Sequence, residues 1–89
     1  MRNTLAFRRT RAAEHVQAAM RSLTLAVGHD DPDLQPIAER LIEGTIGDKP
    51  HLIAVGRSQL EQKRQKGPLP SSMRTLLRML DIPEPNPVV

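Results

Sequence analysis

Apolar residues recur at intervals of three and four along most of this chain, which is the spacing of one face of an α-helix. Four segments show this spacing, and glycine or proline residues lie between them. No segment alternates between apolar and polar residues, as a half-buried strand would. We therefore predict an all-α fold, a small bundle of three to four helices joined by short Gly/Pro turns.

The first predicted helix covers residues 10–27, and its apolar stripe is rich in alanine. The stripe consists of Ala12, Ala13, Val16, Ala19, Met20, Leu23 and Val27. Gly28 follows the last apolar position, where we expect it to end the helix in the left-handed conformation. Leu25 lies off the stripe. Residues 1–9 show no clear period and are predicted to form a basic N-terminal arm.

The stretch GHDDPDLQP predicts a turn followed by the start of a second helix. Asp33 is the expected cap, because Pro36 then falls in the first turn, where a missing N–H costs little. This helix should end near Gly44 or Gly47. Its predicted inner face consists of Leu34, Ile37, Ala38, Leu41 and Ile42.

The third predicted helix has Asp48 as its expected cap and Pro50 in its first turn, and it ends at Gly67 and Pro68. Leu60 is its last strongly apolar residue. The second half, RSQLEQKRQK, is polar almost all round. We therefore expect this half to project from the core or to lie on its surface.

A short amphipathic helix flanked by prolines is predicted within KGPLPSSMRTLLRMLDIPEPNP, with Ser71 as its cap and Pro83 as its stop. The helical domain is accordingly assigned to residues 10–82, and residues 83–89 form a Pro-rich tail. The apolar face of this helix could close the chain's own core or bind a partner. That face consists of Leu69, Met73, Leu76, Leu77 and Leu80.

The length and composition predict a single small domain, and self-association would add to the surface that it buries. With 89 residues, the chain buries a limited share of its surface and would be marginal alone. The core must be aliphatic, because the only aromatic residue is one phenylalanine. The absence of cysteine excludes disulfides, thiolate zinc sites and cysteine nucleophiles, and it fits a cytoplasmic location. The apolar runs are far shorter than the roughly 20 residues that span a bilayer, so we expect no membrane partner.

Charge is distributed in blocks along the chain. Net charge is +4 over residues 1–28, −5 over residues 29–48, +6 over residues 49–78 and −2 over the last eleven residues. Such blocks could complement one another within a bundle or between subunits. The bases Arg57, Lys63, Arg64 and Lys66 are candidate contacts for nucleic acid or for an acidic partner.

A DNA-binding repressor is the alternative that this basic segment supports. The second and third predicted helices could form a helix-turn-helix, in which arginine and glutamine side chains read base edges. Two features weigh against it: the connection GTIGDKP is long for such a turn, and the bases lie at the far end of the third helix.

No enzyme, metal or cofactor site is expected from the remaining polar residues. The three histidines, at positions 15, 29 and 51, lack the one-turn spacing of a helical metal site. His29 and the neighbouring acids lack the alternating acids, central glycine and distant glutamate of a calcium loop. No serine lies in a glycine-rich nucleophile elbow. We therefore predict a non-enzymatic protein.

Two short stretches resemble known families. GPLPSSMRTLLRMLD is similar to the second helix of NepR-type anti-sigma factors, although their upstream aromatic helix has no counterpart here. GHDDPDLQPI and TLLRMLDIP resemble TraM-type quorum-sensing anti-activators, without the helical hairpin that separates the two stretches in that family. The matching positions are Gly28, Asp33, Leu34, Ile37, Thr75, Leu76, Leu77, Leu80 and Pro83. Both resemblances imply a small helical protein that sequesters a transcription regulator.

The resulting prediction is a non-enzymatic regulatory or adaptor protein, self-associating, that binds a protein partner. The predicted mechanism lays the apolar face of the C-terminal helix in a groove of the partner. The basic end of the third helix would orient an acidic partner.

Overall fold

The computed structural model describes the backbone of residues 2–85 and the side chains of residue 15 and residues 17–85. This part of the chain contains four helices and no strand, which confirms the all-α prediction. The helices are α1 (Arg2–Asp30), α2 (Leu34–Ile46), α3 (Pro50–Lys66) and α4 (Ser71–Met79). Within these residues no helix is both long and apolar enough to span a membrane.

Helix α1 is longer than the sequence pattern predicts. It begins at Arg2 instead of residue 10, and it passes through Gly28 to end at Asp30. No proline or glycine interrupts the chain before Gly28, so helical hydrogen bonding continues through the basic segment. The expected left-handed cap at Gly28 is wrong, because Gly28 is part of α1 and does not adopt the left-handed conformation. The helix stops two residues later, ahead of Pro32.

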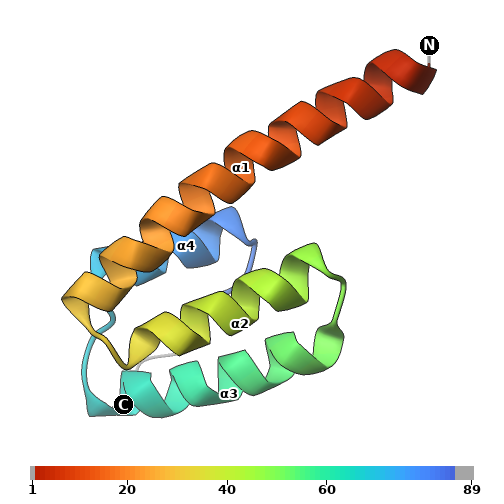
Figure 1. Ribbon diagram of the computed structural model, residues 1–89. Helices are drawn as coiled ribbons and strands as arrows, with labels where there is room; N and C mark the ends of the chain where they lie inside the picture. The colour runs from red at the N-terminus through yellow and green to blue at the C-terminus, as the bar shows by residue number, and fades with distance from the viewer. Residues whose placement is uncertain (1, 86–89) are drawn as a thin grey trace.

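The N-terminal half of α1 extends beyond the other three helices, whereas its C-terminal half packs on α2 and α4 (Figure 1). This extension gives the molecule a long axis of 51 Å against 25 and 20 Å in the other two directions. The extended half contains the residues that the sequence assigned to a basic arm, and their backbone is helical.

Helices α2 and α3 form an antiparallel hairpin (Figure 1). Asp48, expected to cap α3, instead occupies the left-handed region of the turn with a φ of 52°, and Lys49 takes the cap position. Two glycines let the helices approach closely. A Cβ at Gly44 would lie 2.8 Å from Ile53 Cγ1, and one at Gly56 would lie 2.7 Å from Leu41 Cδ2.

Helix α4 begins one residue earlier than a serine cap at Ser71 would require, and Pro70 takes the cap position. The helix ends in a Schellman motif built on Asp81, whose φ is 58°. The Ile82 N–H donates to the Leu77 carbonyl at 2.9 Å, and the Asp81 N–H donates to that of Arg78 at 3.1 Å. The helix is therefore closed before Pro83, and Ile82 packs into the core.

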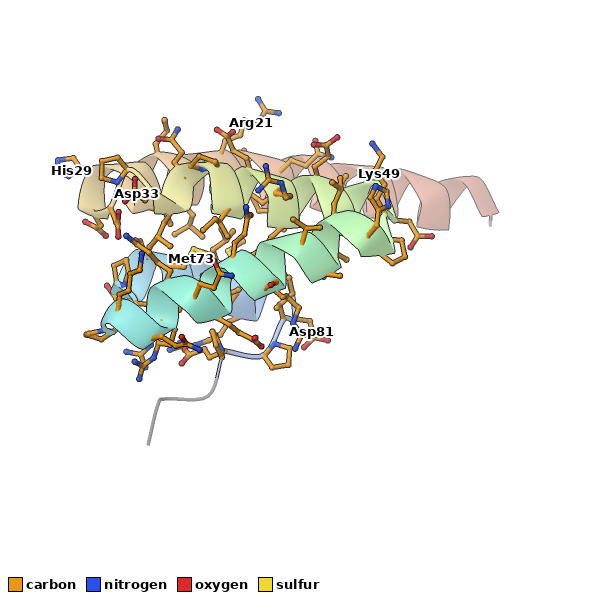
Figure 2. The ribbon with its side chains drawn as sticks, turned by 90° about the horizontal axis from the view of Figure 1, so that it is seen from below. Arg21, His29, Asp33, Lys49, Met73 and Asp81 are labelled. Carbon is orange, nitrogen blue, oxygen red and sulfur yellow. The ribbon has the colours of Figure 1, made fainter. Side chains whose placement is uncertain are left out.

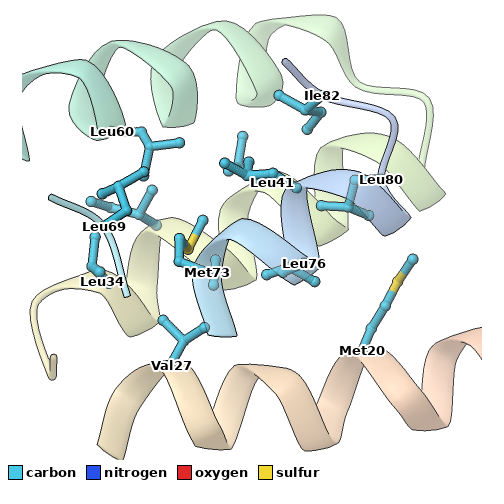
Figure 3. Packing of buried hydrophobic residues seen from close by; sticks show 13 residues of the cluster. Met20, Val27, Leu34, Leu41, Leu60, Leu69, Met73, Leu76, Leu80 and Ile82 are labelled. Atoms are coloured by element: carbon cyan, nitrogen blue, oxygen red, sulfur yellow. The ribbon is translucent and has the colours of Figure 1, made fainter. Parts of the chain in front are cut away.

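The core lies between the C-terminal half of α1, α2 and α4, and α3 contributes Leu60 (Figure 3). The predicted inner face of α2 is confirmed in part, with Ile42 only half-buried. On α1, Met20 and Val27 are buried and Ala19 is exposed, while the side chains of Ala12, Ala13 and Val16 lie outside the described residues. The fully buried large side chains are Val27, Leu34, Leu41, Leu60, Met73, Leu76 and Leu77.

Candidate partner-binding surface

The five residues predicted to contact a partner from α4 belong to the chain's own core. Met73, Leu76 and Leu77 are 0% exposed. Leu69 and Leu80 are also buried, and Figure 3 shows this face directed toward α1, α2 and Leu60. Figure 2 shows Met73 inside the body, whereas Arg21, His29 and Lys49 point away from it. The sequence identified this face correctly but left open which surface covers it.

Exposing that face would cost most of the stability of a small domain. Burial of one leucine or methionine side chain stabilises a fold by about 1.5–3 kcal/mol, so five contribute on the order of 10 kcal/mol as an upper estimate. The whole free energy of unfolding of a small domain is about 5–15 kcal/mol. In the folded chain, the α4 face is therefore part of the chain's own core.

Two polar contacts link the N-terminal half of α4 to other segments. Ser72 Oγ donates to Asp30 Oδ2 at 2.7 Å, which links the start of α4 to the end of α1. Arg74 Nε lies 3.1 Å from Glu84 Oε1, so the segment after α4 folds back along it. These contacts are exposed and individually weak, so each contributes little to stability.

The candidate basic residue Lys63 is already paired within the chain. Its Nζ lies 3.0 Å from Asp31 Oδ2 and 3.3 Å from Asp33 Oδ2. The hydrogen bond from Lys63 lowers the pKa of Asp31, and the same bond raises the pKa of Lys63. The Asp33 backbone N–H also donates to Asp31 Oδ1 at 3.0 Å. This ion pair joins the turn between α1 and α2 to the end of α3.

The four basic positions of α3 do not form one surface. Arg57 and Arg64 line shallow hollows beside the segment that follows α4. Lys63 and Lys66 line a groove on the other side of the helix, between α3 and α2. The antiparallel packing of α2 against α3 also differs from the steep crossing of a helix-turn-helix (Figure 1).

An apolar groove between α1 and α2 is the surface that the sequence pattern missed. Its volume is about 380 Å³, and it is lined by Arg21, Thr24, Leu25, Gln35, Glu39, Ile42 and Glu43. Leu25 is 68% exposed, the largest exposed fraction among the big apolar residues of the described chain. The signal in the sequence was the position of Leu25 off the buried stripe.

The groove is lined by both apolar and charged side chains. Leu25 lines it from α1, and Ile42 lines it from α2. Ile46, which is 47% exposed, follows Ile42 by about one turn and extends the apolar strip along α2. Glu39 and Glu43 are exposed on the α2 wall, and Arg21 is exposed on the α1 wall. This arrangement suits the apolar side of an amphipathic helix.

The acids near His29 are used structurally in the fold. Asp30 accepts the hydrogen bond from Ser72, and Asp31 and Asp33 pair with Lys63. Within the part of the chain that the structure describes, no three histidine, aspartate or glutamate residues are placed to hold a metal ion.

The two resemblances noted in the sequence overlap on α4. Pro68 to Asp81, similar to NepR-type factors, covers the approach to α4 and the helix itself. The TraM-type resemblance covers the junction of α1 and α2 from Gly28 to Ile37, and also α4 and its end from Thr75 to Pro83. The chain as a whole matches no protein-family model, no curated protein and no solved structure.

Proposed function

We propose that this chain is a non-enzymatic regulatory or adaptor protein, which binds an amphipathic helix of a protein partner in the groove between α1 and α2. The main support for this proposal is that Leu25, which is 68% exposed, lines an open groove together with the half-buried Ile42. A folded chain leaves a large leucine in water at little benefit to itself, and its removal from water favours binding by about 25 cal/mol per Å² of apolar surface.

The proposed contact surface thus moves from the α4 face to the groove. The α4 face is covered by the chain's own helices, whereas the groove is open in the folded state. Binding in the groove leaves the core intact and requires no unfolding of α4. The role of α4 in this proposal is to close the core on which α1 and α2 are positioned.

Charge on the groove walls favours a partner helix with a basic flank. Glu39 and Glu43 lie one turn apart on α2, so a basic side chain on the bound helix can pair with either. Glu43 already lies 3.2 Å from Lys49, but both side chains are largely exposed and free to exchange partners. Rim charges of this kind mainly set orientation and association rate.

Affinity capture from a native lysate tests the proposal. The baits are the unmodified chain, Leu25→Lys, and Val55→Lys as the matched control. Val55 is 47% exposed on α3 and does not line the groove. We expect a protein that resists nuclease treatment and is retained by the unmodified chain and by Val55→Lys, but not by Leu25→Lys. Equal capture by all three baits would contradict the groove as the contact surface.

The DNA-binding alternative is tested in the same preparation by a salt-titrated gel shift. Phosphate contacts weaken steeply with salt, since binding releases condensed counterions. Salt-sensitive binding of a duplex, lost when Arg57 and Lys66 are both replaced by Gln, would replace the present proposal.

A further inference from the structure

We propose that the helix bound in the groove is the N-terminal half of α1, residues 2–14, of a second copy of this chain. The result is a two-fold symmetric dimer in which each copy fills the groove of the other. This inference rests on the proposed function, because it names the occupant of the same groove. Four observations support it: the position of the segment, its register, its charge and its inability to reach its own groove.

The segment lies where only another molecule can cover it. Residues 2–14 are helical, and the N-terminal half of α1 extends beyond α2, α3 and α4 (Figure 1). A lone helix of this length is marginal in water, since most helical stability in proteins comes from tertiary packing. The same segment contains Leu5 and Phe7, the latter being the only aromatic residue of the chain. A second copy would supply tertiary packing for this segment.

The helical register relates this segment to the groove. Phe7 and Leu25 are separated by 18 residues of uninterrupted helix, which is five turns at 3.6 residues per turn. The two positions therefore lie on the same side of α1. When two α1 helices pack antiparallel, position 7 of each copy can oppose position 25 of the other. The two-fold axis then passes beside residue 16, the midpoint between them, and the contact is closed and self-complementary.

Charge on the segment complements the groove. Residues 2–11 include Arg2, Arg8, Arg9 and Arg11 and no acid. The α2 wall of the groove presents Glu39 and Glu43. Antiparallel pairing of the two α1 helices brings the basic end of one copy to the acidic wall of the other. The opposed charge blocks of residues 1–28 and 29–48 thereby acquire a structural role.

The segment cannot fill the groove of its own molecule. The groove begins at Arg21, and α1 is one continuous helix from Arg2 to Asp30. Folding residues 2–14 back onto Leu25 would require a break in that helix, and neither proline nor glycine occurs between residues 2 and 27 to favour one. Occupation of the groove by this segment therefore has to occur between two copies.

Sedimentation equilibrium of the full chain over a concentration series tests the inference. We expect a monomer–dimer equilibrium for the unmodified chain and for the control Val55→Lys. Leu25→Lys should raise the dimer dissociation constant by about tenfold or more, because it places a charge in an apolar contact. Circular dichroism verifies that each variant is folded, and both replaced side chains are exposed in the structure.

Charge reversal identifies the occupant. Arg8→Glu with Arg11→Glu should weaken the dimer, and so should Glu39→Arg with Glu43→Arg. The chain that carries all four replacements should recover at least part of the affinity, since opposite charges again face each other. Failure of this recovery, a monomer at every concentration, or equal dimerisation by Leu25→Lys and Val55→Lys would each overturn the inference.

The two proposals fail separately in these experiments. A monomeric chain whose captured partner is lost on Leu25→Lys substitution contradicts the dimer and keeps the groove as a surface for another protein. If the chain dimerises and Leu25→Lys changes neither the dimer dissociation constant nor the capture of the partner, both the dimer contact and the proposed function are contradicted.

Discussion

Ser72 and Asp30 are 42 residues apart in the chain, and the Ser72 hydroxyl donates a hydrogen bond of 2.7 Å to the Asp30 carboxylate. This bond fastens the first turn of α4 to the last turn of α1. The two neighbouring serines therefore differ in role. Ser72 joins two helices, whereas Ser71 is exposed at the first helical position.

Replacement of each serine by alanine distinguishes this arrangement from a serine cap. Ser72→Ala should lower the free energy of unfolding by about 0.5–1.5 kcal/mol, the usual net worth of one hydrogen bond. Ser71→Ala should change it by less than about 0.5 kcal/mol, as is usual for a surface replacement. Urea unfolding followed by circular dichroism measures both values. The reverse order would show that Ser71 caps α4.

Alanine substitutions at two helical glycines test the close packing of α2 on α3. A Cβ at Gly44 would lie 3.0 Å from the backbone nitrogen of Ile53, so Gly44→Ala should destabilise the fold by about 1–3 kcal/mol through overpacking. At Gly28 the nearest obstacle is the end of the flexible Gln35 side chain, and alanine adds helix propensity of about 1 kcal/mol.

The Gly28→Ala protein should therefore be more stable than the Gly44→Ala protein in thermal unfolding. No loss of stability on Gly44→Ala substitution would mean that α2 and α3 are farther apart than the structure shows. A large loss confined to Gly28→Ala would instead support a left-handed glycine at the end of α1.

The burial of the α4 face predicts a sharp contrast between opposite faces of one helix. Leu77→Ala should lower the free energy of unfolding by about 2–5 kcal/mol, because it opens a cavity in a packed core. Met79 lies on the same helix and is 37% exposed. Met79→Ala should therefore lower the free energy of unfolding by less than about 1 kcal/mol. Denaturant titration of the two variants provides the comparison. Similar small losses for both would indicate that α4 does not pack on its own core.

Truncation after Gly67 extends this test. It removes Leu69, all of α4 and Ile82, so the remaining chain should lose cooperative unfolding and bind hydrophobic dyes. A truncated chain that unfolds cooperatively would contradict the assignment of α4 to the core.

The ion pair of Lys63 predicts a specific dependence of stability on pH. Its ammonium holds the pKa of Asp31 below the ordinary value of 3.8. A depressed carboxyl pKa stabilises the fold fully above the ordinary value, and this contribution is lost as the pH falls through the lower, folded-state pKa. The pKa of Lys63 is raised above 10.5 in the fold. The contribution of Lys63 to stability is therefore present at lower pH and is lost as the pH rises through this raised pKa.

Lys63→Met should therefore flatten the decline of stability below pH 3.8 relative to the unmodified chain. Lys49→Met is the control, because Lys49 pairs with Glu43 in an exposed contact elsewhere. Unfolding free energies measured between neutral and acidic pH provide the comparison. Parallel curves for Lys63→Met and the unmodified chain would show that the pair does not form.

Local sequence signals predicted most helix boundaries. Pro50 and Gly67 mark the limits of α3, because a ring without an N–H fits a first turn and glycine follows a last turn. The expected caps at Asp48 and Ser71 were wrong by one residue. Asp48 instead adopts the left-handed conformation that the tight turn into α3 requires, which is a tertiary demand on the backbone.

The candidate site depended on contacts that no local pattern specifies. The apolar face of α4 was evident from helical spacing, but its burial depends on pairing with α1 residues about fifty positions earlier. The exposed position of Leu25 was visible as a departure from the stripe of α1. The groove beside it was not visible, because its other wall comes from α2 and depends on how the two helices pack.

We propose the α1–α2 groove, and not the face of α4, as the contact surface of the folded chain. Methyl NMR spectra of the unmodified protein test it most directly, recorded as the captured partner, or the protein itself, is titrated to saturation. We expect the Leu25 and Ile42 methyl signals to shift with the titration while those of Leu76 and Leu77 stay in place. Shifts confined to Leu76 and Leu77 would contradict it.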